Sequence, residues 1–413
     1  MKKTAAVVLS GGHGSRLFPL TLTRCKPAVH YGGHYRLIDI ALSNAINSKC
    51  DNIYVVTQFL SRSLHQHISN TYQSDVFSNS IDILTVEETP KGKHWLEGTA
   101  DAIRQNLDYL LETAAEYFLI LSGDQLYSMD FNKIMRVAQK SNADVVVASM
   151  PVSDDSTKRL GILGIDENGA ITSFVEKPQT EKQLKELALS SSHLKRLRIP
   201  EAQSQTYLGS MGIYLFKRQA LINLLQKDSR EDFGKHLIPT KVKEGKIVTY
   251  IHKGYWKDIG TIESFYHANM ALNLKKTRLN CHDEKWRLFF HRTMLPGARI
   301  SCADIDSSII CEGTSIEAKK IYHSILGPLA RVLKGTTIKD SYIMGNDTPS
   351  SSASIGKNCV IQKAILDKNV HLGNDVHLIN KQGLTHYDSD HVYIRDGIIV
   401  VPRGARIPNG FIL

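Results

Sequence analysis

Residues 4–17 read T-A-A-V-V-L-S-G-G-H-G-S-R-L, and this stretch decides how the rest of the chain is interpreted. The apolar run Ala5–Leu9 predicts a buried strand that leads directly into a glycine-rich turn. Glycine lacks a Cβ and adopts positive φ, so backbone N–H groups in such a turn can surround an anion. Two cations follow the turn at close range and can grip phosphate oxygens. The sequence therefore predicts a polyphosphate cradle made by Gly11, Gly12, Gly14, Arg16 and Lys26.

The spacing of this turn matches neither common phosphate motif. It lacks the G-K-[ST] ending of a Walker A loop, and its glycines do not follow the G-x-G-x-x-G pattern. A tight connection without a ligand is the alternative, because a glycine turn after a strand is common. Arg16 and Lys26 favour the phosphate interpretation, since two cations beside the turn need an anionic partner.

Length and composition limit the possible classes of protein. A chain of 413 residues suits two domains, and 42% hydrophobic with 22% charged residues is typical of a globular protein. The apolar run ends at Leu9, too early for a secretion signal, and no stretch reaches the ~20 apolar residues of a membrane helix. The six cysteines show no CxxC spacing, which indicates reduced thiols. We therefore expect a cytoplasmic protein.

The net charge of +10 comes from scattered basic residues without a polybasic tail. Nucleic-acid binding is a poor explanation, because basic and aromatic residues do not interleave. Small phosphorylated ligands explain the excess more simply, although a basic solvated surface stays possible.

Apolar runs and helical patterns alternate along the first two-thirds of the chain. Buried strands are predicted at Ile53–Thr57, Ile81–Val86, Tyr117–Leu121, Ala143–Ser149 and Met211–Phe216. Helices are predicted at residues 99–112, with Thr99 as the cap, within the Ser- and Lys-rich segment 180–205, and at residues 261–273. Continuous apolar strands separated by helices imply a doubly wound, mostly parallel (Rossmann-like) α/β domain.

Beyond Pro296 the pattern changes, and short β-branched pieces recur every five or six residues. A hexapeptide-like period predicts a parallel β-helix, and an antiparallel β-sandwich is the alternative. We expect an α/β domain at residues 1–273, a linker at 274–296 and a β-helix domain for regulation and oligomerisation at 297–413.

Two aspartates follow segments that end opposite the predicted cradle. Asp124 comes directly after the strand Tyr117–Leu121, and Asp258 precedes the last α/β helix. Paired carboxylates facing a phosphate site suit Mg²⁺, which shares oxygen ligands with substrate phosphates. A helix cap or a turn is the alternative role for either residue alone. Lys177, fixed by Pro178 at a strand end, would hold a second phosphate, although a surface lysine before a turn is equally common.

These groups combine into one reaction scheme. The cradle holds a triphosphate, the aspartates hold Mg²⁺ at its α-phosphate, and Lys177 holds a sugar phosphate whose oxygen displaces pyrophosphate. Positioning and charge stabilisation suffice for such a transfer, so the lack of a Ser–His–Asp or Cys–His pattern is consistent with it.

Eight motifs in order resemble the ADP-glucose pyrophosphorylase (glucose-1-phosphate adenylyltransferase) family across nearly the whole chain. They are Gly11–Leu17, Lys26–Ala28, Tyr35–Asp39, Gly98–Asp101, Ser122–Asp124, Val175–Pro178, Ser210–Tyr214 and Trp256–Thr261. The tail from Ile365 through Lys381 is similar to the plant and cyanobacterial branch.

The resemblance implies transfer of AMP from ATP to glucose 1-phosphate for glycogen or starch synthesis, in an allosteric homotetramer with a left-handed β-helix. It implies catalytic roles for Arg16, Lys26 and Asp124, and nucleotide binding by Gly98 and Thr99 together with the cradle. It also implies a magnesium site at Asp124 and Asp258 and a glucose 1-phosphate site at Glu176, Lys177 and Ser210. The implied allosteric residues are Lys368, Lys381, Gln58 and Trp95.

The chain also departs from the family pattern. Thr23 replaces an activator-site lysine, and Leu96 replaces an aromatic residue near the adenine. The N-terminal cysteine extension of plant subunits is missing, so we expect no redox control through it. Two alternatives stay open: a sugar-1-phosphate nucleotidylyltransferase that uses UTP, dTTP or GTP, and a non-catalytic regulatory subunit.

Overall fold

The computed structural model describes residues 1, 3–12, 14–72, 80–85, 88–89, 92–93, 95–199, 205–349 and 354–413. It consists of an α/β half, which runs from β1 to η4 (residues 4–273), and a β-helix half, which runs from β16 to β32 (residues 299–407). Residues 274–298 between them form neither helix nor strand. None of the helices in the described ranges is long and apolar enough to cross a bilayer.

The strands of the α/β half alternate with helices, and most of them belong to one sheet. The strands are β1 (Thr4–Leu9), β2 (His30–Tyr31), β3 (Tyr35–Arg36), β4 (Asn52–Thr57), β5 (Ser80–Thr85), β6 (Glu88–Thr89), β7 (Gly92–Lys93), β8 (Tyr117–Ser122), β9 (Gln125–Tyr127), β10 (Val145–Ser153), β11 (Gly161–Ile165), β12 (Ile171–Glu176), β13 (Thr206–Lys217), β14 (Ile247–Ile251) and β15 (Trp256–Asp258). The helices are η1 (Ser15–Leu17), η2 (Lys26–Ala28), α1 (Leu37–Asn47), α2 (Arg62–Tyr72), α3 (Thr99–Gln105), α4 (Leu107–Leu111), α5 (Asn132–Ser141), α6 (Asp154–Thr157), α7 (Glu181–Leu187), α8 (Ser191–Leu197), α9 (Arg218–Lys227), η3 (Phe233–Leu237), α10 (Ile238–Glu244), α11 (Ile262–Met270) and η4 (Ala271–Asn273).

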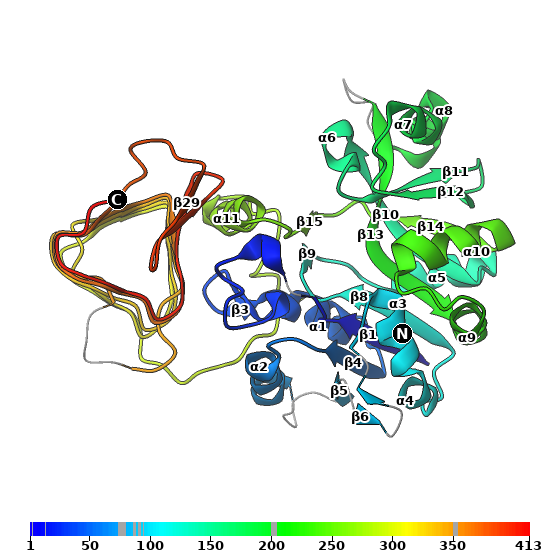
Figure 1. The fold of residues 1–413 in the computed structure, drawn as a ribbon, viewed down its shortest axis with the longest axis horizontal. Coiled ribbons are helices and arrows are strands. Elements are labelled where there is room, and N and C mark those ends of the chain that lie inside the picture. The colour runs from blue at the N-terminus through cyan, green and yellow to red at the C-terminus, as the bar shows by residue number, and fades with distance from the viewer. Residues whose placement is uncertain are drawn as a thin grey trace.

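The main sheet has the order β12-β11-β13-β8-β1-β4-β5, and β10 joins β13 to β14 (Figure 1). Strands β8, β1, β4 and β5 are parallel, whereas β13 runs antiparallel to β8, β10 and β11. Alternate residues of β1 enter different cores: Ala6 and Val8 pack with α1, α2, α5 and α11, whereas Ala5 and Val7 pack with α3, α4, α9 and α10. Helices therefore cover both faces of the sheet, which confirms the predicted doubly wound α/β architecture.

One helix differs from its prediction. The expected helix at residues 99–112 is divided into α3 and α4 at Asn106. Gly98, and not Thr99, occupies the cap position of α3. The Thr99 hydroxyl instead accepts a hydrogen bond from the N–H of Phe233, at 3.0 Å. The tertiary contact with η3 thus uses the side chain that local propensity would assign to capping. The predicted strand 81–86 corresponds to β5, and Val86 lies outside the described residues.

The β-helix half winds as a triangular coil of short, mostly parallel strands, and β29 and β30 add an antiparallel hairpin beside β31 (Figure 1). Its strands are β16 (Arg299–Ile300), β17 (Asp304–Asp306), β18 (Ile309–Ile310), β19 (Ser315–Ile316), β20 (Lys320–Tyr322), β21 (Ile325–Leu326), β22 (Arg331–Val332), β23 (Thr337–Lys339), β24 (Tyr342–Ile343), β25 (Val360–Gln362), β26 (Ala364–Leu366), β27 (His371–Leu372), β28 (His377–Leu378), β29 (His386–Asp388), β30 (Tyr393–Arg395), β31 (Ile398–Val401) and β32 (Arg406–Ile407). Ile305, Ile321, Ile338, Ile361 and Leu378 stack in register along one side of the coil. The parallel pairing confirms the predicted β-helix and excludes the β-sandwich.

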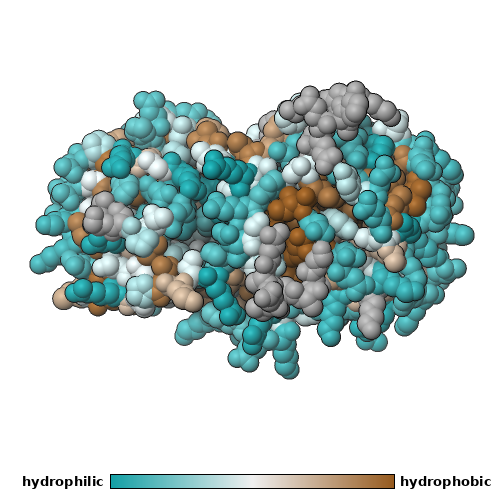
Figure 2. Space-filling view, turned by 90° about the horizontal axis from the view of Figure 1, so that it is seen from below, coloured by the Kyte–Doolittle hydropathy of each residue, from teal (hydrophilic) through white to brown (hydrophobic). Residues whose placement is uncertain are grey.

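The two halves share one hydrophobic cluster. Phe265 and Met270 of α11 pack with Tyr342, Ile365 and Val400 of the coil. The Tyr266 hydroxyl donates to the carbonyl of Asp340 at 2.7 Å. Seen from below, the α/β half carries a hollowed apolar area, whereas the β-helix half is mostly hydrophilic (Figure 2).

Candidate active site

The glycine-rich turn lies beyond the carboxyl end of β1 and forms the wall of a cavity of about 300 Å³. Gly12 and Gly14 have φ values of +124° and +58°, which L side chains rarely adopt. A Cβ on Gly14 would lie 3.0 Å from the Cβ of Lys26, so the turn and the lysine are in close contact. Gly11, Gly12, Gly14, Arg16, Lys26 and Asp124 all line this cavity. His13 lies outside the described residues.

Lys26 and Asp124 form an ion pair inside the cavity. The Nζ atom of Lys26 donates to Oδ2 of Asp124 at 2.6 Å, and the Ser122 hydroxyl donates to the other carboxylate oxygen. Burial alone would raise the pKa of Asp124, but Lys26 and the Ser122 hydroxyl hold that pKa below its ordinary value. Asp124 is therefore an ionised carboxylate at neutral pH.

A short antiparallel ladder brings Asp258 to the same place. Strands β9 and β15 pair so that Asp258 stands opposite Gln125, the residue after Asp124. Burial raises the pKa of Asp258, and the charge of Asp124 acts in the same direction. A Cβ on Gly260 would lie 2.9 Å from Oδ2 of Asp258 and 3.5 Å from Nη1 of Arg16. The ladder thus joins both carboxylates and one guanidinium from distant parts of the chain.

The pairing of β9 with β15 involves a side-chain bond that sequence reasoning missed. The indole N–H of Trp256 donates to Oε1 of Gln125 at 3.1 Å. Gln125 is buried, and both residues line the cavity that also holds Asp258. No sequence signal marks this contact, because strands of three residues carry no readable periodicity.

A second cavity of about 270 Å³ adjoins the first and contains Glu176, Lys177 and Ser210. Lys177 directly follows β12 and has a φ of +50°, and its N–H donates to the carbonyl of Leu160 at 3.0 Å. Its side chain is half exposed, with Nζ 3.4 Å from Oε1 of Glu176. Burial raises the pKa of Glu176. A Cβ on Gly161 would lie 2.7 Å from Oε2 of that carboxylate.

The predicted nucleotide-binding pair Gly98 and Thr99 is divided between two environments. Thr99 lines the second cavity together with Asp232, a residue that no sequence pattern singled out. Gly98 lines none of the cavities described here, and a Cβ there would lie 2.4 Å from the carbonyl oxygen of Glu231. Gly98 therefore permits the backbone of α3 to approach the loop before η3.

The predicted allosteric residues do not lie together. Lys368 is buried between the two halves, where its Nζ donates to the carbonyl of Asn346 at 3.2 Å. Burial lowers its pKa to about 8. Lys381 lies in an exposed turn after β28, and no described contact connects it to Lys368.

Gln58 and Trp95 lie near the cradle, in neighbouring loops. The side-chain amide of Gln58 donates to the carbonyl of Leu96 at 3.2 Å and accepts from its N–H at 3.0 Å. Trp95 is 52% exposed and stacks on Phe59, with ring centroids 5.3 Å apart. A Cβ on Gly11 would lie 3.8 Å from the side-chain amide group of Gln58, so Gln58 connects this loop to the cradle.

Comparison with known families agrees with this architecture. The model of the family described as "Nucleotidyl transferase" matches residues 5–275. The model described as "GLGC left-handed parallel beta-helix domain" matches residues 293–412. Together with the paired cavities at the sheet edge, these matches show that the chain belongs to the nucleotidyl transferase family and has the architecture of ADP-glucose pyrophosphorylase-like proteins.

Proposed function

We propose that this protein is a glucose-1-phosphate adenylyltransferase, which transfers AMP from ATP to glucose 1-phosphate and releases pyrophosphate. One observation carries the proposal: the cradle with Arg16, Lys26 and Asp124 opens beside a second cavity that holds Glu176 and Lys177. Two adjoining anion sites with the ionised carboxylate of Asp124 beside them suit a triphosphate and a sugar phosphate. The product, ADP-glucose, would supply glucosyl units for glycogen or starch.

In the proposed reaction a phosphate oxygen of glucose 1-phosphate attacks the α-phosphorus of ATP. A new P–O bond forms as the bond between the α- and β-phosphates breaks, and the electron pair leaves with pyrophosphate. Lys177 would hold the attacking phosphate, and Glu176 with Ser210 would orient the sugar. Arg16 and the N–H groups of the cradle would neutralise the charge that develops on the leaving pyrophosphate. No proton transfer is needed, because the attacking oxygen is already ionised.

The two aspartates fit a magnesium ion. The β9–β15 ladder places the carboxylates of Asp124 and Asp258 beside the cradle, and hard cations prefer such oxygen ligands. Three or more metal-ligating side chains do not gather at any point of the described chain. Two carboxylates plus substrate phosphates are the set that Mg²⁺ usually shares with nucleotides. The ion would polarise the α-phosphate when it is bound.

Turnover with different triphosphates tests the proposal. The purified protein would be incubated with Mg²⁺, glucose 1-phosphate and, in turn, ATP, UTP, dTTP and GTP, and pyrophosphate release would be measured. We expect the largest kcat/KM with ATP. Preference for another triphosphate would mean that the same mechanism acts on a different nucleotide. The other triphosphates are tested because the aliphatic Leu96 stands where the family has an aromatic residue near the adenine. No turnover with any triphosphate would indicate a non-catalytic regulatory subunit.

Regulation and assembly form the second part of the proposal. The similarity of the tail to the plant and cyanobacterial branch, and the burial of Lys368 between the halves, support control by a phosphorylated metabolite. We propose a cytoplasmic homotetramer in which Gln58 and Trp95 couple effector binding to the cradle. Lys368→Ala and Lys381→Ala should weaken activation in a metabolite titration and retain basal turnover. An unchanged activation curve would exclude both lysines, and sedimentation would measure the assembly.

A further inference from the structure

A cavity of about 760 Å³ lies beside the proposed catalytic cleft, and that cleft accounts for only part of its lining. It shares Arg16, Arg159, Leu160, Trp256 and Asp258 with the cavity of Glu176 and Lys177, and it shares Arg16 and Gly260 with the cradle. Its remaining walls come from the end of β10, α6, the first turn of α11 and the segment after η4. In Figure 1, β15 lies between α11 and the lobe that carries α6.

Four cationic side chains line this cavity, and only two acidic ones oppose them. The cations are Arg16, Arg159, Lys257 and Arg278, and the acids are Asp155 and Asp258. Among the described residues, none of the four cations forms a side-chain hydrogen bond or an ion pair within the chain. The four cations outnumber the two carboxylates, so their fields leave a net positive potential inside the cavity.

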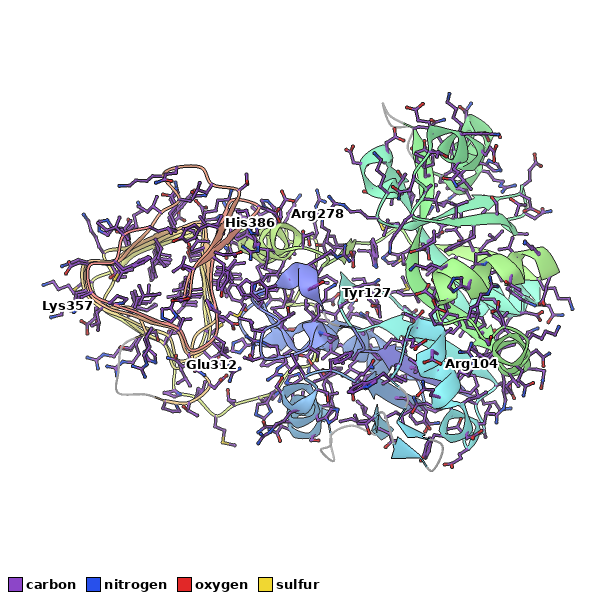
Figure 3. All side chains as sticks on the ribbon, in the orientation of Figure 1. Arg104, Tyr127, Arg278, Glu312, Lys357 and His386 are labelled. Carbon is purple, nitrogen blue, oxygen red and sulfur yellow. The ribbon has the colours of Figure 1, made fainter. Side chains whose placement is uncertain are left out.

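Lys257 and Arg278 belong to this cavity alone. Neither lines the cradle or the cavity of Glu176 and Lys177. Side chains alternate along a strand, so Lys257 points away from the face that Trp256 and Asp258 share on β15. Arg278, labelled in Figure 3, follows the last helix of the α/β half. It lies close enough to Tyr255 to influence its hydroxyl electrostatically.

The first turn of α11 adds to the positive potential. Thr261 caps this helix by accepting from the N–H of Ser264 at 3.1 Å, and both residues line the cavity. The amino end of a nine-residue helix carries a partial positive charge. Three kinds of donor thus converge: guanidinium groups, an ammonium group and hydroxyls.

We propose that this cavity is a second anion site, in which Lys257 and Arg278 bind a phosphoryl group separately from the catalytic phosphates, with Arg159 at the border that it shares with the cavity of Glu176 and Lys177. Arg159 stands on the wall next to α6, and Arg278 stands on the wall next to α11. A phosphoryl anion between them would join the two walls. Pyrophosphate on its way out of the cleft and a separate phosphorylated metabolite share the required chemistry.

Titration calorimetry with inorganic pyrophosphate, without Mg²⁺, nucleotide or sugar phosphate, tests the proposal. The wild-type protein should bind two pyrophosphates per chain, one in the catalytic cleft that the cradle and the cavity of Lys177 form together, and one in the new site. In Lys257→Gln/Arg278→Gln, one of the two sites should weaken at least ~10-fold, because each lost cation removes a charge-assisted hydrogen bond. Arg136→Gln removes an exposed cation that lines none of these cavities, and it should retain both sites.

A single site in the wild-type protein, or two unchanged sites in the double variant, would overturn the proposal. Both replaced residues are exposed, and the melting temperature of each variant would show that it is folded. Displacement of the second pyrophosphate by glucose 6-phosphate would assign the site to a phosphorylated metabolite. Resistance to glucose 6-phosphate would assign it to the leaving pyrophosphate. Because the titration needs no turnover, its result does not depend on whether ATP is the true donor.

Discussion

The two halves of this molecule place their important residues in opposite ways. In the β-helix half, neighbours in space are separated by one coil in sequence, as Ile321 and Ile338 are. In the α/β half, Lys26 contacts Asp124 across 98 positions, and Asp124 meets Asp258 through a ladder of two short strands. Local repetition builds the coil, whereas long-range pairing builds the proposed catalytic centre. A substitution should therefore affect stability in one half and chemistry in the other.

The largest effect is expected at the junction of the halves. Arg24 and Asp367 form an ion pair in which both side chains are 1% exposed. Asp367→Asn leaves the guanidinium buried without its counter-charge, which should lower the free energy of unfolding by about 3–5 kcal/mol. Chemical denaturation measures this value. The double variant Arg24→Met/Asp367→Leu should be less destabilised than the single one, and an equal or larger loss would show that the charge itself is not the cause.

Lys368, beside this ion pair, should make stability depend on pH. Burial lowers its pKa from 10.5 to about 8, so the folded state binds fewer protons than the unfolded state between these values. This lysine therefore destabilises the fold below pH 8, and the effect disappears as the pH rises toward 10.5. The free energy of unfolding of Lys368→Met, measured relative to that of wild type, should therefore fall by about 3 kcal/mol between pH 8 and pH 10.5. A difference that does not change with pH would contradict the burial of a charged amine.

Asp124→Asn tests the long-range pairing of the α/β half. The amide cannot pair with Lys26 or hold a divalent cation, so kcat should fall by ~10² or more, equivalent to about 2.7 kcal/mol. Stopped assays of pyrophosphate release measure kcat, and circular dichroism should show an unchanged fold. Asp304→Asn, at an exposed carboxylate of the β-helix half, is the matched control. Nearly normal turnover would remove Asp124 from the proposed centre.

The smallest effect is expected inside the coil. Ile338 is fully buried and stacks between Ile321 and Ile361. Ile338→Val removes one methyl group and should cost about 0.5–1.5 kcal/mol of stability without changing kcat. Thermal unfolding measures the loss, and Lys339→Ala, at the outward-facing neighbour, should cost less. A fall in kcat at a temperature where the variant is folded would show that packing in the β-helix half also affects catalysis in the α/β half.

The same contrast explains how much the sequence could predict. The β-branched residues around Ile316 and Ile361 repeat with the period of the coil, so their parallel stacking was readable. The strand before Gly11 and the cations after it also predicted a turn beyond a strand end. Both signals are local in sequence, and the structure follows each of them.

Other features depend on contacts that no local pattern records. The helix predicted at residues 99–112 divides at Asn106, and at its start the Thr99 hydroxyl accepts from the N–H of Phe233 in η3 while Gly98 approaches Glu231. Strands β9 and β15 have three residues each, too few for a periodicity, although they join the two carboxylates. The burial of Lys368 could not be anticipated either, since an isolated lysine in a polar turn usually faces water.

Helix α11 has a mechanical consequence for the whole molecule. Its first residue follows Asp258 by four positions, and its side packs against Tyr342 and Val400 of the coil. A short rod fixed at one end to a carboxylate and along its flank to a second body rotates with both. A displacement of the coil against the α/β half would therefore act on α11 and, through it, on the position of Asp258.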